Sequence, residues 1–172
     1  MKNILLLFVL SAAIVACKQE RKEVIVTKEI KPGDQPDNNS QVKLVDQFYT
    51  ALTARDSAGV VNLMAENAKL YGSDPSEDWN LDQIKSYMSE RMRDTTVKAV
   101  FNVKKREVRI MNDWMLVTDE IEISTIRVPF RVVTIAEKKD GEQKIIFSEF
   151  SALVRNEDIL QLELLFDKAK GK

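Results

Sequence analysis

The chain of 172 residues contains no histidine. Histidine is the commonest general base in enzymes and a frequent ligand of zinc. Its absence excludes a Ser-His-Asp triad and every metal site that needs an imidazole. Any acid–base chemistry in this protein must therefore use carboxylates and other titratable side chains.

Cysteine occurs only once, at position 17. A single cysteine cannot form an intramolecular disulfide, so the fold must be stabilised by a packed core. It also excludes a zinc site built from several cysteines, and its place near the N-terminus argues against a catalytic nucleophile.

Long apolar runs and an excess of one charge are lacking as well. The chain has 26 Lys and Arg against 27 Asp and Glu, and removal of residues 1–16 takes away only Lys2, which leaves 25 against 27, a net charge of −2. Proteins that bind nucleic acids are usually strongly basic, so no nucleic-acid partner is expected. The uncharged run Ile4–Val15 is shorter than the roughly 20 residues that span a bilayer.

That run fits the apolar region of a secretion signal. It ends in Ile14-Val15-Ala16-Cys17, which resembles the lipobox of bacterial lipoproteins. The resemblance implies cleavage after residue 16 and attachment of acyl chains such as palmitate to Cys17, which would anchor the protein to a membrane of the cell envelope. Lys18 stands where Asp would imply inner-membrane retention, which favours the outer membrane.

The chain is expected to comprise a signal peptide (1–16), the lipidated Cys17 with a flexible tether (17–40), one domain (41–168) and a polar tail (169–172). Val24-Ile25-Val26 could form a short strand, but the Lys, Glu and Pro around it favour a solvated linker that holds the domain clear of the bilayer.

Apolar spacing predicts three helices followed by strands with alternating apolar residues. The expected helices cover about 41–55, 57–64 and 81–92, and the expected strands cover 68–73, 97–110, 115–124, 127–137, 144–155 and 160–167. Helices on one side of an antiparallel meander predict an α+β domain.

Several stretches resemble the NTF2-like superfamily, in particular its SnoaL-like and ketosteroid-isomerase-like members. They are residues 48–56 with 60–64, residues 131–134 leading to 138–145, and residues 156–167, which are similar to the closing strand of the family. The resemblance covers about 41–167 and implies a cone, in which three N-terminal helices pack on a curved antiparallel sheet around a pocket. The family includes enzymes and binding domains, and it commonly dimerises, so a homodimer is possible. Gln143 and Glu149 replace a Trp and a His that other members carry.

Asp119 is the leading candidate for a functional residue. Strict alternation places it on the same face as Val117 and Ile121, where burial would raise its pKa. Two alternatives remain open, since a bulge could turn it outward, or an arginine could pair with it for structural reasons.

Arg131 and Glu149 are the second candidates, and their pairing depends on the turn at Asp140-Gly141. A type I turn with a glycine bulge places Arg131 opposite Glu149, whereas a two-residue type I′ turn places it opposite Phe150. Tyr49 could donate a hydroxyl, although its helix stripe favours the core, and Trp79 could lie at the mouth of a pocket. No spacing predicts a metal site, and no cofactor is expected.

These observations favour a non-catalytic lipoprotein domain that binds a small apolar ligand or a protein of the cell envelope. The alternative is a lyase- or isomerase-like enzyme with Asp119 or Glu149 as general base and a tyrosine as proton donor.

Overall fold

A computed structural model describes residues 24–28, 40–93, 96 and 98–169. The predicted signal peptide, Cys17 and most of the polar tail lie outside the described residues. Among the helices of the described part, none is both long and apolar enough to cross a membrane.

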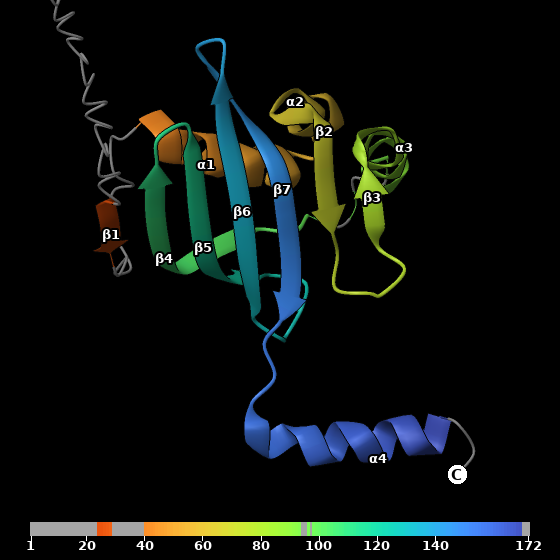
Figure 1. Ribbon diagram of the computed structural model, residues 1–172. Helices are drawn as coiled ribbons and strands as arrows, with labels where there is room; N and C mark the ends of the chain where they lie inside the picture. The colour runs from red at the N-terminus through yellow and green to blue at the C-terminus, as the bar shows by residue number, and fades with distance from the viewer. Residues whose placement is uncertain (1–23, 29–39, 94–95, 97, 170–172) are drawn as a thin grey trace, which may run out of the picture.

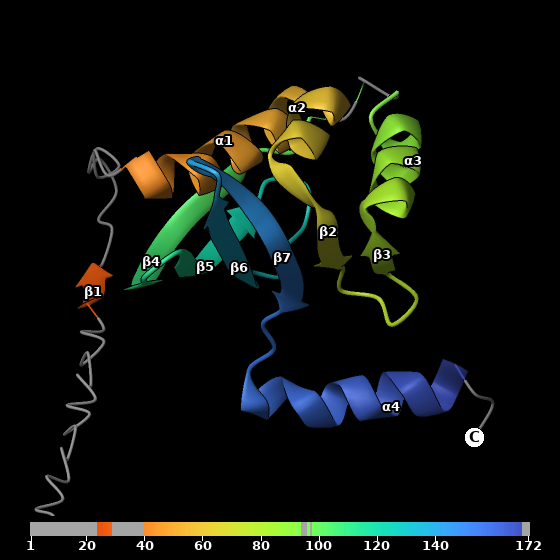
Figure 2. The same cartoon turned by 45° about the horizontal axis from the view of Figure 1, so that its top comes forward.

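A seven-stranded sheet lies at the centre of the domain. Its strands are in the order β1-β4-β5-β6-β7-β2-β3. Helix α1 crosses one face of the sheet, as Figures 1 and 2 show from two directions. This arrangement confirms the predicted α+β fold with N-terminal helices on a mostly antiparallel sheet.

The three predicted helices are present, and their ends follow from local chemistry. Helix α1 (Ser40–Ala54) ends at Arg55, whose φ of 58° is left-handed. Helix α2 (Ser57–Asn62) begins where the Asp56 carboxylate accepts a hydrogen bond from the Gly59 amide at 2.8 Å. Helix α3 (Leu81–Arg91) begins with a capping box, in which the side chains of Asn80 and Gln83 each accept a hydrogen bond from the other's backbone N–H.

The predicted meander is confirmed, with shifted strand ends. Its strands are β4 (Phe101–Met111), β5 (Trp114–Ile123), β6 (Phe130–Lys139) and β7 (Glu142–Ala152). Strand β2 (Met64–Tyr71) begins earlier than predicted and runs parallel to β7, and the short strand β3 (Asp78–Asn80), which was not predicted, pairs with β2.

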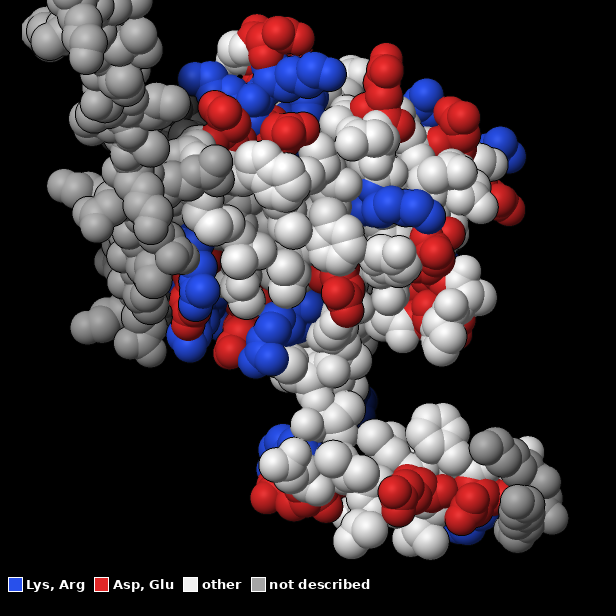
Figure 3. All heavy atoms as spheres, viewed as in Figure 1, with Lys and Arg blue, Asp and Glu red and all other residues white. Residues whose placement is uncertain are grey.

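The core lies between α1 and the inner face of the sheet. Alternate residues of the meander point into it, and fully buried side chains include Phe48, Met115, Ile121 and Ile145. The outer face carries uncharged side chains over its centre, where Figure 3 shows a white area bordered by charged residues.

The turn at Asp140-Gly141 is of the two-residue kind. Both residues have positive φ, 53° and 85°, as a type I′ turn requires, and Lys139 pairs with Glu142. Further along, Ile135 pairs with Phe147 whereas Ala136 pairs with Ile145, so Ile146 is an extra residue in β7. This bulge shifts the register beyond it by one more residue than the turn alone predicts.

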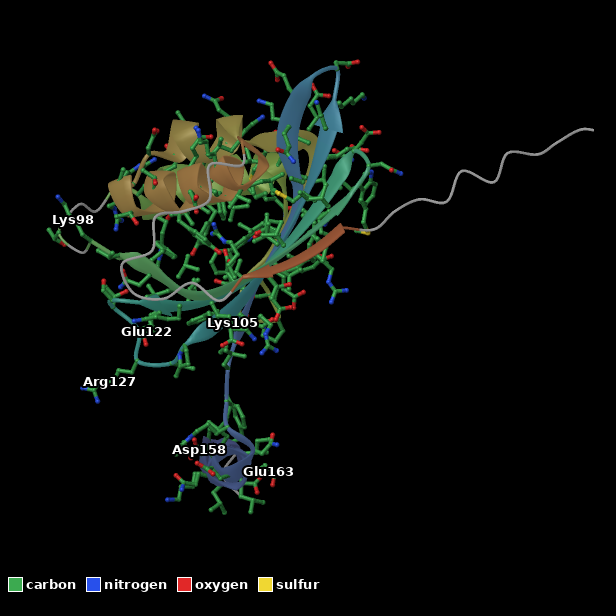
Figure 4. The ribbon with its side chains drawn as sticks, turned by 90° about the vertical axis from the view of Figure 1, so that its left-hand side faces the viewer. Lys98, Lys105, Glu122, Arg127, Asp158 and Glu163 are labelled. Atoms are coloured by element: carbon green, nitrogen blue, oxygen red, sulfur yellow. The ribbon has the colours of Figure 1, made fainter. Side chains whose placement is uncertain are left out.

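The prediction of a strand over residues 160–167 was wrong, because this segment forms the helix α4 (Ile159–Ala169). Leu, Gln, Glu, Lys and Ala favour a helix, and β7 already has β6 and β2 on its two sides. The closing strand is β7. Helix α4 packs on the 3-10 turn η1 (Asn156–Asp158) and is set apart from the sheet, as the labelled Asp158 and Glu163 show in Figure 4.

The preference for a linker at residues 24–26 was also wrong. Residues Val24–Lys28 form the strand β1, which pairs antiparallel with β4 at the edge of the sheet. Three consecutive β-branched residues, followed by Thr27, give this segment a strong tendency to form a strand.

We expect the replacement of Leu164 by Glu to leave the free energy of unfolding of the domain within about 0.5 kcal/mol of the wild type, because Leu164 is 63% exposed on α4. The control is Ile121→Ala, which empties a fully buried position and should cost about 2–5 kcal/mol. Urea denaturation followed by circular dichroism measures both. A large loss in Leu164→Glu would show that α4 packs on the domain in solution.

Candidate functional site

Asp119 lies on the inner face of β5 with no exposed surface. Strand β5 pairs without a bulge from Trp114 to Ile121 with β6, so the alternation seen in the sequence holds along it. The predicted inward direction is therefore confirmed, and the alternative of an outward-turned carboxylate is wrong.

Arg106 is the direct partner of Asp119. The register of β4 against β5 shifts between Val103 and Lys105, so that Arg106 lies opposite Asp119 and points inward. Its Nε donates to Oδ1 of Asp119 at 2.7 Å, and its Nη2 donates to Oδ2 at 2.9 Å. This two-point contact is the strongest arrangement of an arginine and a carboxylate.

Helix α1 completes the site with two side chains one turn apart. The hydroxyl of Tyr49 donates to Oδ2 of Asp119 at 3.0 Å, and Nη1 of Arg106 donates to Oδ1 of Asp46 at 2.7 Å. We call Asp46, Tyr49, Arg106 and Asp119 the buried network. Asp46 is its outermost member, with 31% of its side chain exposed.

Burial dominates the electrostatics of the buried network. It raises the pKa of Asp119, whereas the hydrogen bonds and charge of Arg106 act in the opposite direction. Burial and the nearby Asp119 carboxylate raise the pKa of Tyr49 well above its ordinary value. For Arg106, burial alone lowers the pKa, but Asp119 and Asp46 outweigh it and the net change is upward. At neutral pH Arg106 is therefore charged and Tyr49 is protonated.

The carboxylate of Asp119 accepts hydrogen bonds at both of its oxygens. Three N–H or O–H groups point at its two oxygens, which is the pattern of an ionised carboxylate. Among the described residues, no buried side-chain nitrogen or oxygen lacks a hydrogen-bond partner. To act as a base, Asp119 would have to give up bonds that stabilise its charge, so this geometry suits a structural role.

Arg131 and Glu149 do not pair with each other. The turn is type I′, as the second register supposed, but the bulge at Ile146 places Arg131 opposite Ser151 and Glu149 opposite Val133. Nη2 of Arg131 lies 3.3 Å from Oε1 of Glu120, and the two side chains are 48% and 39% exposed. Glu149 accepts a hydrogen bond from the Ser151 hydroxyl at 2.9 Å.

Glu149 and Arg131 both belong to the outer face of the sheet, on the opposite side from Asp119. Trp79, the remaining predicted residue, lies on β3, where its ring stacks on Tyr87 with the centroids 4.2 Å apart. Of the predicted site residues that the structure describes, it brings together only Tyr49 and Asp119. Within the described part of the chain, no three acidic side chains converge as metal ligands would.

Sequence reasoning missed Arg106 and Asp46. Simple alternation along β4 from Val103 would direct Lys105 inward and Arg106 outward, and only the bulge reverses this. The adjacent Lys104-Lys105, which interrupts the apolar alternation between Val103 and Val108, predicts a bulge at this place, and the register shift confirms it, but the pairing of Arg106 with Asp119 was not inferred from it. Asp46 lies on α1 between the buried Val42 and Tyr49, at the border of the apolar stripe, and the sequence pattern did not identify it as a partner of a buried arginine.

We expect Arg106→Met to lower the free energy of unfolding by about 3–5 kcal/mol, because it leaves the Asp119 charge buried without its partner. The double variant Arg106→Met/Asp119→Leu should recover much of this loss, since no unpaired charge remains. A double-mutant cycle in urea measures the coupling.

The control for that cycle is Arg131→Met, which removes an exposed pair with Glu120 and should change the free energy of unfolding by less than about 1 kcal/mol. If the effects of Arg106→Met and Asp119→Leu simply add, the two side chains do not interact and the assignment is incorrect.

The raised pKa of Tyr49 predicts a loss of stability in alkali. The folded protein holds this proton more tightly than the unfolded chain, whose tyrosines ionise near pH 10. The stability that Tyr49 contributes through its raised pKa is therefore fully present below a pH of about 10. Above that pH this contribution to the free energy of unfolding falls by up to about 1.4 kcal/mol per pH unit. Tyr49→Phe should lack this dependence.

The test is to measure the free energy of unfolding of the wild type and of Tyr49→Phe at several alkaline pH values. The difference between the two proteins should shrink as the pH rises. Tyrosinate absorbance of the folded state provides a second reading. An equal slope in the two proteins would mean that Tyr49 ionises normally.

The comparisons with known proteins concern the domain rather than the buried network. A search of the curated proteins gives no match. An NTF2-like protein of unknown function from Pseudomonas putida KT2440 is 16% identical, with a TM-score of 0.60, and the alignment covers 67% of this chain and 86% of that one. An NTF2-like protein from Cytophaga hutchinsonii ATCC 33406 is 17% identical over 69% and 100% of the two chains, with a TM-score of 0.56.

A candidate ketosteroid isomerase from Shewanella frigidimarina NCIMB 400 is 19% identical, with a TM-score of 0.57 and coverage of 66% of this chain and 96% of that one. At these identities the likeness shows the NTF2-like fold alone. The sequence itself gives a closer assignment, because residues 42–155 match the model of a family described as the SnoaL-like domain. The chain therefore belongs to the SnoaL-like family, within the NTF2-like fold.

Proposed function

We propose that this protein is a lipid-anchored lipoprotein of the bacterial cell envelope, and that its SnoaL-like domain binds a partner protein or a small apolar ligand without catalysing a reaction. The anchor is supported by the sequence Ile14-Val15-Ala16-Cys17 after a short apolar run. The absence of catalysis is supported by the bonding of Asp119.

The hydrogen bonds and burial of Asp119 are the observation that supports the absence of catalysis. A carboxylate that acts as a general base needs a lone pair within reach of the substrate proton. It must also be able to lose its charge when it takes up that proton. Asp119 has no exposed surface, and Arg106 engages both of its oxygens. These contacts leave Asp119 no free surface from which to reach a substrate.

The outer face of the sheet offers a surface for binding. Leu116, Val133, Ile135 and Phe147 lie on it in adjacent rows, and all four are partly exposed. Figure 3 shows an uncharged area on this face, with charged side chains around it. This composition, an apolar centre with a polar border, resembles that of protein–protein interfaces and supports the proposal of an envelope protein or a second copy of the chain as the partner.

An isomerase- or lyase-like enzyme is the second candidate, and one observation favours it. Tyr49 and Asp119 form a buried pair of a proton donor and a carboxylate, 3.0 Å apart, and both have raised pKa values. Such shifts are common at active sites. Arg106 weighs against this reading, because it stabilises the charged form that a base must lose.

We expect the chain, produced in a bacterial host from its full sequence, to incorporate labelled palmitate and to fractionate with membranes. The Cys17→Ser variant should incorporate no label, because Cys17 supplies the only thiol in the sequence. Glu163→Gln, a change at an exposed position of α4, serves as the matched control and should be labelled like the wild type.

Two outcomes would contradict the proposal, one for the anchor and one for the absence of catalysis. An unlabelled wild type contradicts the anchor. Turnover of a carbonyl compound or steroid by the purified domain contradicts the absence of catalysis, provided that Asp119→Asn abolishes it while circular dichroism shows an intact fold.

A further inference from the structure

Strand β1 determines where the chain enters the domain. It pairs antiparallel with β4, so that Val24 lies beside Ile110 and Lys28 lies beside Arg106. The first residue of β1 is therefore at the end of the sheet that carries the turn Asn112-Asp113 between β4 and β5. Figure 1 shows β1 at the edge of the sheet, with β4 running in the opposite direction.

This entry point limits the distance between Cys17 and the sheet. Only residues 18–23 separate Cys17 from Val24, and a chain advances at most about 3.6 Å per residue, or about 25 Å in seven steps. Residues 29–39 follow β1 and add nothing to this reach. If Cys17 carries lipid, as proposed above, the hairpin end of the sheet is held close to the bilayer.

Two large apolar side chains are exposed at that end. Met111 and Trp114 flank the turn and pair with each other, and they are 39% and 45% exposed. Tryptophan is enriched at the boundary between lipid and water, because its ring is apolar and its N–H can bond to headgroups. Methionine is flexible enough to adapt to a fluid surface.

The charged side chains near this turn carry no net positive charge. Lys138 and Lys139 in the adjacent hairpin are accompanied by Asp113, Glu137 and Asp140. The backbone N–H of Lys138 donates to the carbonyl of Asp113 at 2.6 Å, which joins the two hairpins. Attraction to anionic lipids is therefore not the driving force, and the contact has to rest on the apolar side chains and the anchor.

We propose that the β4–β5 hairpin tip, defined as residues 111–114, is a second membrane contact, in which Met111 and Trp114 insert among the headgroups of the bilayer that holds Cys17. This inference rests on the proposed lipid anchor, and it specifies the orientation of the anchored domain relative to the bilayer. The apolar residues of α4 and of residues 124–129 belong to the opposite end of the sheet, where Ile121 pairs with Phe130, and face away from this bilayer.

The experiment uses the chain produced from its full sequence, purified in detergent and reconstituted into phosphatidylcholine vesicles with brominated acyl chains, which quench tryptophan at short range. Trp79→Phe leaves Trp114 as the only tryptophan, and Trp114→Phe leaves Trp79, which is stacked on Tyr87 at the other edge of the sheet. In vesicles, Trp114 should lose emission and shift to shorter wavelength, whereas Trp79 should do neither.

Mass spectrometry of the same sample separates the two proposals. An acylated chain in which Trp114 remains unquenched overturns the hairpin contact and leaves the anchor standing. A chain without lipid overturns the anchor, and the contact that rests on it falls too. Quenching of Trp79 to the same extent as Trp114 also overturns the contact, because it would place a different part of the domain against the lipid.

Discussion

The arrangement of helix and sheet depends on the ion pair between Arg106 and Asp119. The two side chains belong to neighbouring strands, and both are almost fully buried. A buried charge without a partner costs several kcal/mol, so the core can close only when the two lie opposite each other. A shift of β4 by one residue would direct Lys105 or Glu107 toward Asp119 and leave it without the two-point contact.

Two side chains of helix α1 bind to the same ion pair. Tyr49 reaches the second oxygen of Asp119, and Asp46 takes the remaining nitrogen of Arg106. The pair thus fixes the register of two strands and the position of the helix above them. An apolar core of the same volume would provide comparable stability but would distinguish less sharply between neighbouring registers.

Much of this architecture was predictable because its signals are local. The three N-terminal helices, the presence of a hairpin turn at Asp140-Gly141 and the alternation around Asp119 each depend on a few adjacent residues, and each was predicted, although the type of that turn was left open. The partner of Asp119 was not predictable in this way, because it depends on a bulge in another strand. The same applies to Arg131, whose neighbour is set by the extra residue at Ile146.

The two wrong predictions of secondary structure have a common cause. In both, a local pattern was interpreted without knowing which strand edges were free. Residues 160–167 alternate like a strand, but β6 and β2 already flank β7, and α4 forms instead. Residues 24–28 stand in a stretch that looks like a linker, but the edge of β4 was open to them. Local propensity sets what a segment can form, and the available partners decide which form it takes.

Both segments lie outside the family match at residues 42–155, and they leave the domain at opposite ends. Strand β1 enters beside the β4–β5 hairpin, whereas α4 follows the end of β7, where Ala152 pairs with Phe130. If Cys17 is anchored, the short connection to β1 orients the whole sheet, since one end is near the bilayer and the other is not. The apolar side chains of α4 are then presented away from that bilayer, on the side where other proteins of the envelope can reach them. A shared SnoaL-like core would in this way acquire a defined orientation from one added strand, without any change in its interior.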